Sequence, residues 1–283
     1  MIDLHCHSIC SDGTLSPEEL AQRGRDFSVF AITDHDNCDG GARFLEASRG
    51  QRGVRLAGIE LSLDPGASFG EFHMLGLGID PGSRSLADFL DAIRRGRDER
   101  NERMVAKLCE IGMPLTMEEV RSFAGSEVVA RPHVARAMMK RGYVGSIAEA
   151  FAKAIGPGRP AYCSRFHPSP ASAIDAVHAA GGVAVMAHPA SWTKDPAALR
   201  AGLARLKDLG LDGIEAVYQA NTPDVTLDHL RAARELGLAV SAGSDFHGAN
   251  KPDITLGMDV ENEMEFIAPL LERLAQVRKE NGK

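Results

Sequence analysis

The chain has 283 residues, of which 44% are hydrophobic and 25% are charged, and this composition predicts a folded domain rather than a disordered chain. The net charge of −7 argues against broad binding to a nucleic-acid backbone. No apolar run is long enough for a transmembrane helix, and we expect no secretory leader. The five cysteines form no Cys-x-x-Cys pair, which indicates a reducing compartment, most simply the cytoplasm.

The first twelve residues contain a pattern typical of metal ligands. Ile2 and Leu4 alternate with polar positions, which predicts a short strand. Because side chains two apart in a strand share one face, we expect His5 and His7 to point the same way. Two imidazoles so placed can hold one metal ion, and the carboxylate of Asp12 can reach a second. A surface strand that carries two histidines by chance is the alternative.

Strand and helix patterns alternate through most of the chain. Apolar runs predict buried strands at 29–33, 54–59, 72–75, 182–187, 213–218 and 239–244. Helical patterns lie at 169–180, 197–209 and 227–236, and Ser16-Pro17-Glu18-Glu19 opens another helix with a capping box. This alternation predicts βαβ units, a parallel sheet and an α/β fold, a (β/α) barrel or a close relative. In such folds the chemistry gathers at the carboxyl ends of the strands.

One segment, 85–163, breaks the alternation. It is predicted to be helical throughout, with an Arg-rich helix at 86–111 and a capped helix after Thr116. Two further helices are expected to begin at Arg131 and after Ser146. The pattern indicates a helical insertion between two barrel strands.

The expected domain organisation follows from this insertion. Residues 1–84 and 164–283 would form the barrel, and residues 85–163 a helical insertion that covers the active site. Residues 94–141 carry a local charge of +4, which leaves −11 for the remainder. A basic segment suits the capture of a small anion, although a solvated helical face is the simpler interpretation for most of its arginines.

Most of the candidate metal ligands lie at the ends of predicted strands. Six of the ten histidines and three carboxylates make up the set: His5, His7, Asp12, His35, Glu60, His73, His188, Asp245 and His247. Imidazole and carboxylate are the ligands of Zn, Mn or Fe, and the set contains no thiolate of a structural zinc site. Nine ligands are more than one metal ion can bind, and their number suits two or three ions. Such clusters activate water and neutralise charge when phosphate esters are hydrolysed.

These ligands stand in six short motifs that span nearly the whole chain. The motifs are Asp3-Leu4-His5-Cys6-His7, Thr33-Asp34-His35-Asp36, Gly58-Ile59-Glu60, His73-Met74-Leu75-Gly76, Ala187-His188-Pro189 and Gly243-Ser244-Asp245-Phe246-His247-Gly248. In this order they resemble the PHP (polymerase and histidinol phosphatase) family of metal-dependent phosphoesterases. The resemblance implies a distorted seven-stranded (β/α) barrel with two or three divalent ions, Mn before Zn or Fe.

The resemblance also implies which residues hold each ion. The first ion would be held by His5, His7, Glu60 and Asp245. Glu60 would bridge to a second ion, held by His73 and His188. The third ion would be held by Asp12, His35 and His247. Asp245, Glu60 and His188 are the residues that we assign to catalysis, whereas Asp34 and Asp36 are expected to orient His35 or form its turn.

The insertion narrows the resemblance. Arg131-Pro132-His133 and the segment 158–162 resemble the PHP subgroup that acts on nucleoside 3′,5′-bisphosphates and short 5′-phosphorylated RNA. By that resemblance Arg131 and His133 would bind substrate phosphate. Members of the subgroup often follow His-Pro with a Gly-Arg-Tyr stretch, where this chain has Ala190-Ser191-Trp192-Thr193-Lys194. Lys194 is therefore the candidate replacement for the arginine, and Trp192 a candidate platform for a base.

The expected function is hydrolysis of a phosphate monoester, namely the 3′-phosphate of a nucleoside 3′,5′-bisphosphate or a short 5′-phosphorylated oligonucleotide. A histidinol-phosphate or other small-molecule phosphatase is one alternative, and an amide hydrolase, in which the phosphate-binding residues would be idle, is another. A non-catalytic metal-binding PHP module serving a polymerase is the third, against which the complete ligand set argues. We expect a small phosphorylated partner, no membrane and no long nucleic acid. The native metal, the general acid and the oligomeric state stay open at this point.

Overall fold

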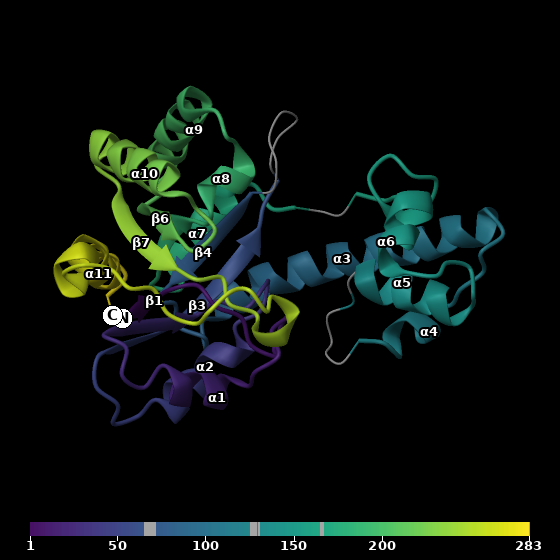
Figure 1. Cartoon of the computed structure of the whole chain (residues 1–283), viewed down its shortest axis with the longest axis horizontal. Helices are drawn as coiled ribbons and strands as arrows, with labels where there is room; N and C mark the ends of the chain where they lie inside the picture. Colours follow the sequence, from purple (N-terminus) through teal and green to yellow (C-terminus); the bar gives the residue numbers. More distant parts are fainter. Residues whose placement is uncertain (65–71, 125–128, 130, 165–166, 283) are drawn as a thin grey trace. The chain divides into compact units, whose positions relative to one another are not determined.

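The computed structural model describes residues 1–64, 72–124, 129, 131–164 and 167–282. The chain divides into two compact units. The first, here called the barrel unit, comprises Met1–Phe89 and Pro168–Lys283, and the second, the helical unit, comprises Leu90–His167. Figure 1 shows the sheet in the first unit and a bundle of helices in the second. The domain bounds expected from the sequence and the covering role of the insertion stay predictions.

One seven-stranded sheet organises the barrel unit, and its strands follow chain order. The strands are β1 (Ile2–Asp3), β2 (Val29–Ile32), β3 (Val54–Ser62), β4 (His73–Leu77), β5 (Val183–Met186), β6 (Gly213–Tyr218) and β7 (Ala239–Gly243). Backbone hydrogen bonds from Leu4 N to Ala242 O and from His7 N to Phe246 O, both 2.9 Å, join the two ends of the sheet. The sheet therefore forms a nearly closed barrel, which confirms the expected α/β barrel fold (Figure 1).

One strand runs against the expected direction. β4 pairs antiparallel with both β3 and β5, whereas the other neighbouring strands pair parallel. Residues 63–72 alone separate the end of β3 from the start of β4, and Ser62 pairs directly with His73. A parallel pair needs a crossover of a dozen or more residues, so this connection is too short for one. The prediction of a uniformly parallel sheet is wrong at β4.

The first strand is shorter than the pattern of the first residues predicts. β1 ends at Asp3, and the Asp3 carboxylate accepts the backbone N–H of His5 at 3.2 Å and of Ser244 at 3.0 Å. A side chain thus takes the place of a strand partner for His5. The expectation that His5 and His7 point the same way holds without the longer strand, since both rings approach Glu60.

Helices surround the sheet of the barrel unit (Figure 1). They are α1 (Pro17–Arg23), α2 (Asp39–Ala47), α7 (Pro170–Ala179), α8 (Pro189–Trp192), α9 (Pro196–Asp208), α10 (Pro223–Leu236) and α11 (Glu263–Glu280), with a 3₁₀ turn at Gly248–Asn250. The capping box predicted at Ser16 and Glu19 is present at α1. Five of these helices begin with proline, whose missing N–H has no partner to lose at that position.

The core of the barrel unit joins its strands to the C-terminal helix. Apolar residues at spacing two on the strands, such as Val183 and Val185, belong to one buried cluster. α11 contributes four residues at helical spacing, Ile267, Leu270, Leu274 and Val277. Burial of this cluster fixes the strands near whose carboxyl ends most of the candidate ligands lie; His73 is the exception, because it begins the antiparallel strand β4.

The helical unit has a core of its own. Its helices are α3 (Arg84–Glu110, which starts in the barrel unit), α4 (Met117–Arg121), α5 (Arg131–Lys140) and α6 (Ile147–Ala150), followed by a π-helical turn at Phe151–Ile155. Thr116 and Ser146 cap α4 and α6, as the sequence predicts. Met104, Leu108, Val134 and Met138 are among the buried residues that pack together. None of the described helices of either unit is long and apolar enough to cross a membrane.

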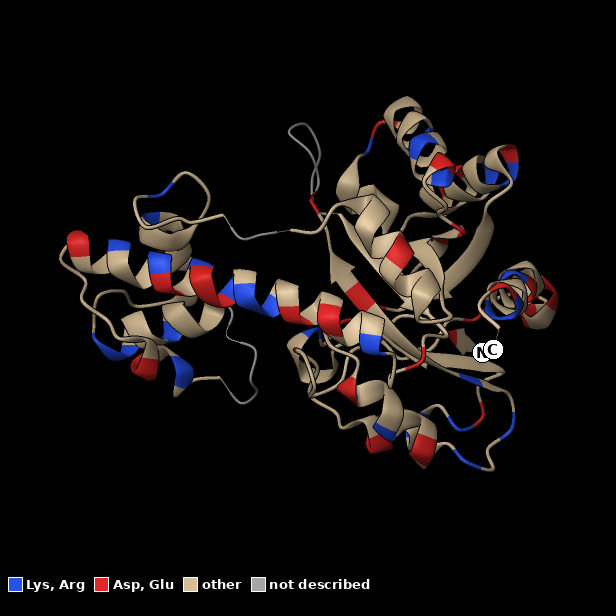
Figure 2. Ribbon diagram, turned by 180° about the vertical axis from the view of Figure 1, so that it is seen from behind, with Lys and Arg blue, Asp and Glu red and all other residues tan. Residues whose placement is uncertain are grey.

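Charges of both signs alternate along α3, as Figure 2 shows for the long helix. Arg95 and Arg103 are exposed, in agreement with a solvated face. Arg97 and Arg100, in contrast, are 9% and 5% exposed. These two arginines are the exceptions to the solvated face that is expected for most of the arginines in this segment.

Replacing Leu270, which is 1% exposed on α11, by alanine is expected to lower the free energy of unfolding by about 2–5 kcal/mol, because it leaves a cavity in the barrel core. Leu227→Ala on α10 is the matched control, since that side chain is 50% exposed and its loss should change stability by less than about 0.5 kcal/mol. Urea unfolding of both variants measures the difference. Equal stabilities would contradict the role of α11 in the core.

Candidate metal centre

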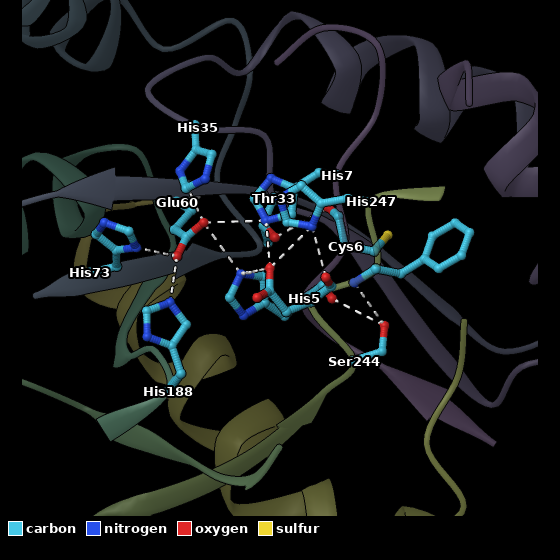
Figure 3. Close-up of polar contacts among 12 residues, drawn as sticks. His5, Cys6, His7, Thr33, His35, Glu60, His73, His188, Ser244 and His247 are labelled. Atoms are coloured by element: carbon cyan, nitrogen blue, oxygen red, sulfur yellow. Dashed lines mark hydrogen bonds and ion pairs between the residues drawn. The ribbon is translucent and has the colours of Figure 1, made fainter. Parts of the chain in front are cut away.

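Glu60 lies at the centre of five histidines. It stands near the end of β3, where its backbone N–H donates to Asp34 O at 3.1 Å. Its Oε1 lies 2.8 Å from His73 Nδ1 and 3.0 Å from His188 Nε2. Its Oε2 lies within 3.3 Å of one ring nitrogen in each of His5, His7 and His35. The two oxygens therefore face two different groups of rings (Figure 3).

Asp245 approaches the same rings from the end of β7. Its Oδ1 lies 3.2 Å from His7 Nε2, 3.6 Å from His5 Nε2 and 3.4 Å from His247 Nδ1. Because Asp245 and Glu60 both face His5 and His7, these two rings lie between two carboxylates.

Asp12 lies on the loop that follows His7. Its Oδ1 is 3.3 Å from His247 Nε2 and 3.6 Å from His7 Nδ1, and its Oδ2 is 3.8 Å from His35 Nε2. The Asp12 side chain is 54% exposed, whereas the His5 and His7 side chains are fully buried. Asp12 therefore lies on the solvent side of the centre, and the rings that it faces lie beneath it.

The structure brings all nine predicted ligands together. Their donor atoms form four groups in which all atoms lie within 4.8 Å of one another: His7, Asp12, His35 and His247; His5, His7 and Asp245; His5, Glu60 and His188; His35, Glu60 and His73. The expected sets placed His73 with His188 and kept His35 apart from Glu60. Which residues share an ion stays a prediction.

Unpaired buried atoms provide a test of whether these residues fit metal ions. Among the described residues, His5 Nε2, both ring nitrogens of His7, His35 Nδ1 and Glu60 Oε2 are buried without a hydrogen-bond partner. Buried polar atoms are almost always paired, so a converging set of unpaired donors needs an explanation. A divalent cation satisfies nitrogen and carboxylate donors at once. The residues present therefore fit divalent metal ions.

The electrostatics of the cluster also favour added positive charge. Burial would lower the pKa of His7, but the carboxylates of Asp245 and Glu60 raise it to about 9. Burial would raise the pKa of Glu60, but the facing histidines, led by His35, hold it well below its ordinary value. Burial lowers the pKa of His35 to about 4. The buried carboxylates thus stay ionised and stabilise a cation between them.

Two of the predicted ligands have an unusual backbone conformation. His188 has φ of 26° and Asp245 has φ of 59°, in the left-handed region that side chains rarely adopt. Each costs on the order of 1–3 kcal/mol and persists where the surrounding structure enforces it. Each residue lies two positions after the end of its strand, β5 or β7, and this backbone conformation turns its side chain into the centre.

Glu215 is the residue that sequence reasoning missed. It lies on β6, is fully buried, and accepts from His5 Nδ1 at 2.9 Å and from the backbone N–H of His188 at 2.7 Å. The first contact fixes the His5 tautomer, so that Nε2 faces Glu60 and Asp245. The signal was a single acid inside the apolar strand 213–218.

Gly243 makes room for this contact. A Cβ atom at that position would lie 2.4 Å from Glu215 Oε1 and 2.3 Å from His5 Cβ. Only glycine lets β7 pass so close to the Glu215–His5 pair.

Asp34 holds the loop that carries Asp12. Its carboxylate accepts from Ser8 N, Ser8 Oγ and Ser11 Oγ, each at 2.7 Å. Asp34 therefore acts on the loop after His7 rather than on the ring of His35.

The predicted substrate contacts lie in both units. In the helical unit, Arg131 begins α5, where its guanidinium lies 5.4 Å from the centre of the Phe151 ring, and His133 is half-buried. In the barrel unit, Lys194 is exposed after α8. Their roles as phosphate contacts stay predictions.

Trp192 has a packing role. It is 7% exposed, its ring centre lies 5.5 Å from that of Phe72, and it fills the space beside Gly202. The suggestion that Trp192 stacks on a base is not supported, because the ring is used inside the barrel unit.

Glu215→Gln is expected to weaken Mn²⁺ binding by roughly tenfold to hundredfold, because the amide can accept from only one of the two N–H groups that Glu215 satisfies. Titration of the metal-free protein with Mn²⁺ measures the affinity. Glu272→Gln, at an exposed position of α11, is the control and should bind as the wild type does. An unchanged affinity in folded Glu215→Gln would refute the positioning role.

Comparisons with known proteins show which proteins this chain is similar to. The family model described as the PHP domain matches residues 3–154. A 3′,5′-nucleoside bisphosphate phosphatase from Chromobacterium violaceum is 35% identical over 250 residues, which cover 87% of each chain. A 5′-3′ exoribonuclease from Haemophilus influenzae is 33% identical and covers 87% of this chain and 89% of its own length.

A solved structure supports the fold. It is an amidohydrolase from Chromobacterium violaceum with bound sulfate and no metal, 32% identical, with a TM-score of 0.78 over 98% of this chain and 96% of the other. The match therefore includes both units. Because the family model covers more than half of the chain and full-length relatives exceed 30% identity, the chain belongs to the PHP family of metal-dependent phosphoesterases.

Proposed function

We propose that the protein hydrolyses the 3′-phosphate of a nucleoside 3′,5′-bisphosphate, or cleaves short 5′-phosphorylated oligonucleotides, with divalent ions held by the nine clustered residues. The observation that carries the proposal is the convergence of unpaired ring nitrogens and carboxylates on Glu60. When bound, such ions activate water and neutralise the charge that develops at phosphorus.

Two or three ions fit the number of donors, and Mn²⁺ is the metal that we propose, before Zn²⁺ or Fe²⁺. Glu60 offers one oxygen to His73 and His188 and the other to His5, His7 and His35, which suits a bridging ligand. His188 and Asp245 are held in place by the strained backbone that follows β5 and β7. With Glu60 they are the residues that we assign to catalysis.

The substrate class rests on three arguments. The relatives named above act on a nucleoside bisphosphate and on RNA. The related amidohydrolase binds sulfate, a tetrahedral dianion like phosphate. Arg131 and His133 are the proposed phosphate contacts in the helical unit. A guanidinium such as that of Arg131 can donate two parallel hydrogen bonds to one phosphate. Lys194 is the proposed contact after α8.

A small substrate suits the charge of the chain better than a long nucleic acid, because the net charge is −7. All five cysteines are free, as befits the reducing compartment that we propose, the cytoplasm. Hydrolysis of histidinol phosphate or another small ester is the main alternative, and a non-catalytic module is the alternative of a different class.

With Mn²⁺ supplied, adenosine 3′,5′-bisphosphate is expected to exceed 5′-AMP, histidinol phosphate and a 5′-phosphorylated oligoribonucleotide in kcat/KM. Arg131→Ala should remove this preference, since it removes the proposed phosphate fork. Steady-state kinetics on the four substrates provides the measurement, and Arg121→Ala, at an exposed position of α4, is the control. Similar slow rates on all four would reject this substrate class. No turnover with Mn, Zn, Fe or Co would favour the non-catalytic module.

Glu60→Ala and Asp245→Ala are expected to lose bound metal and to lower turnover of a chromogenic aryl phosphate by at least about a thousandfold, because each removes a carboxylate from the centre. Asp175→Ala, exposed on α7, is the control. Metal analysis accompanies the kinetics. Activity near that of the wild type with metal retained would contradict the assignment of Glu60 and Asp245 as metal ligands.

A further inference from the structure

One cation of the barrel unit reaches the candidate centre. Lys251 Nζ lies 2.7 Å from Asp245 Oδ2. Among the ion pairs of the described residues, this one alone joins a lysine or arginine to Asp12, Glu60 or Asp245; the other pairs of these carboxylates are with histidines. Lys251 therefore stands apart from the surface lysines of the barrel unit.

The two oxygens of Asp245 have different partners. Oδ1 faces His5, His7 and His247, as described above. Oδ2 accepts from Tyr218 Oη at 3.0 Å and from Lys251 Nζ. The Lys251 ammonium thus contacts Oδ2 of the same carboxylate whose Oδ1 faces the predicted metal ligands.

The backbone around Lys251 is fixed. Ala249 N donates to Thr14 Oγ1 at 2.9 Å, and Asn250 Nδ2 donates to Asp12 O at 2.7 Å. Gly248 has φ of 63°, and a Cβ there would lie 2.0 Å from Thr14 Oγ1. These contacts fasten the turn before Lys251 to the loop that carries Asp12. The turn thus places the backbone of Lys251 beside the centre, and the contact with Asp245 places its ammonium.

The Lys251 ammonium has three N–H donors. Within the described part of the chain, Asp245 accepts from one of them and no other acceptor is found. Its side chain is 42% exposed, and that of Asp12, across the centre, is 54% exposed. Substrate can therefore approach the ammonium from the same side as the predicted ligands.

We propose that Lys251 is a substrate-binding residue whose ammonium contacts a non-bridging oxygen of the phosphate at the metal centre. This inference rests on the proposed function only in that the ligand is a phosphate. It assigns to the barrel unit a cationic contact that is independent of Arg131, His133 and Lys194. A charge-assisted hydrogen bond from a fixed ammonium stabilises a dianion more than a neutral donor does. Asp245 serves both sides, since Oδ1 faces the metal ligands and Oδ2 holds the ammonium.

Calorimetric titration of inorganic phosphate into the Mn²⁺-loaded full-length protein tests the proposal without turnover. Lys251→Met is expected to raise the Kd for phosphate by roughly tenfold to hundredfold, the effect of losing one charge-assisted hydrogen bond. Bound Mn²⁺ should stay unchanged, and Lys251→Arg should recover most of the affinity. Lys279→Met, at an exposed position of α11, is the matched control with the same charge change.

Tyr218→Phe separates charge from support of Asp245. It removes the other donor to Oδ2 but keeps the ammonium, and we expect its phosphate Kd to rise less than that of Lys251→Met. Should Lys251→Met fail to fold, Lys251→Gln removes the charge while keeping a polar N–H group. An unchanged phosphate Kd in folded Lys251→Met or Lys251→Gln overturns the proposal. Loss of Mn²⁺ together with phosphate binding also overturns it, because Lys251 would then only support Asp245.

The two proposals fail separately. If adenosine 3′,5′-bisphosphate is not hydrolysed but Lys251→Met weakens phosphate binding, the substrate class is wrong and the Lys251 contact stands. If the bisphosphate is hydrolysed but the phosphate Kd does not respond to Lys251→Met, the Lys251 contact is wrong and the substrate class stands.

Discussion

The burial of Glu60 between five histidine rings is the constraint on which the rest of the structure depends. A carboxylate that is 1% exposed stays ionised only where positive charge or hydrogen bonds compensate its lost hydration. Here several of the converging ring nitrogens and Glu60 Oε2 are buried without a hydrogen-bond partner, so the histidines and the carboxylate do not satisfy one another completely. Divalent ions resolve both deficits, which links the stability of this end of the barrel to its metal chemistry.

The barrel provides the means to assemble such a centre. Its predicted ligands come from the ends or near the ends of strands that lie far apart in the sequence, and closure between β1 and β7 brings the first and last of them together. Glu215 and Asp34 then position what the strands deliver, one through His5 and the backbone of His188, the other through the loop before Asp12. The strained backbone at His188 and Asp245 is the cost of directing side chains inward from parallel strands.

Charge is distributed in a way that suits a small dianion. The centre combines buried carboxylates with histidines, and the proposed phosphate contacts come from separate parts of the chain, Lys251 beside Asp245, Lys194 after α8, and Arg131 at the start of α5. The ions would carry the charge stabilisation at phosphorus, and these cations would bind and orient the ester. An acidic remainder around a basic segment opposes long polyanions but not a nucleotide.

Much of this protein could be predicted from the sequence, because the information was local. Caps at Ser16, Thr116 and Ser146 need only a residue three positions on, and the metal-ligand residues stand in short motifs at strand ends. The direction of β4 follows from the short connection 63–72, a local feature that the general strand–helix alternation does not reveal. The packing of Trp192 and the roles of Glu215 and Lys251 depend instead on contacts in the folded chain. Trp192 packs against Phe72, Glu215 holds His5, and the pair of Lys251 and Asp245 gains its meaning from the histidines around it. The sequence by itself determined which chemistry the chain carries; the tertiary structure decided which atoms meet, because only closure of the sheet brings distant donors within contact distance.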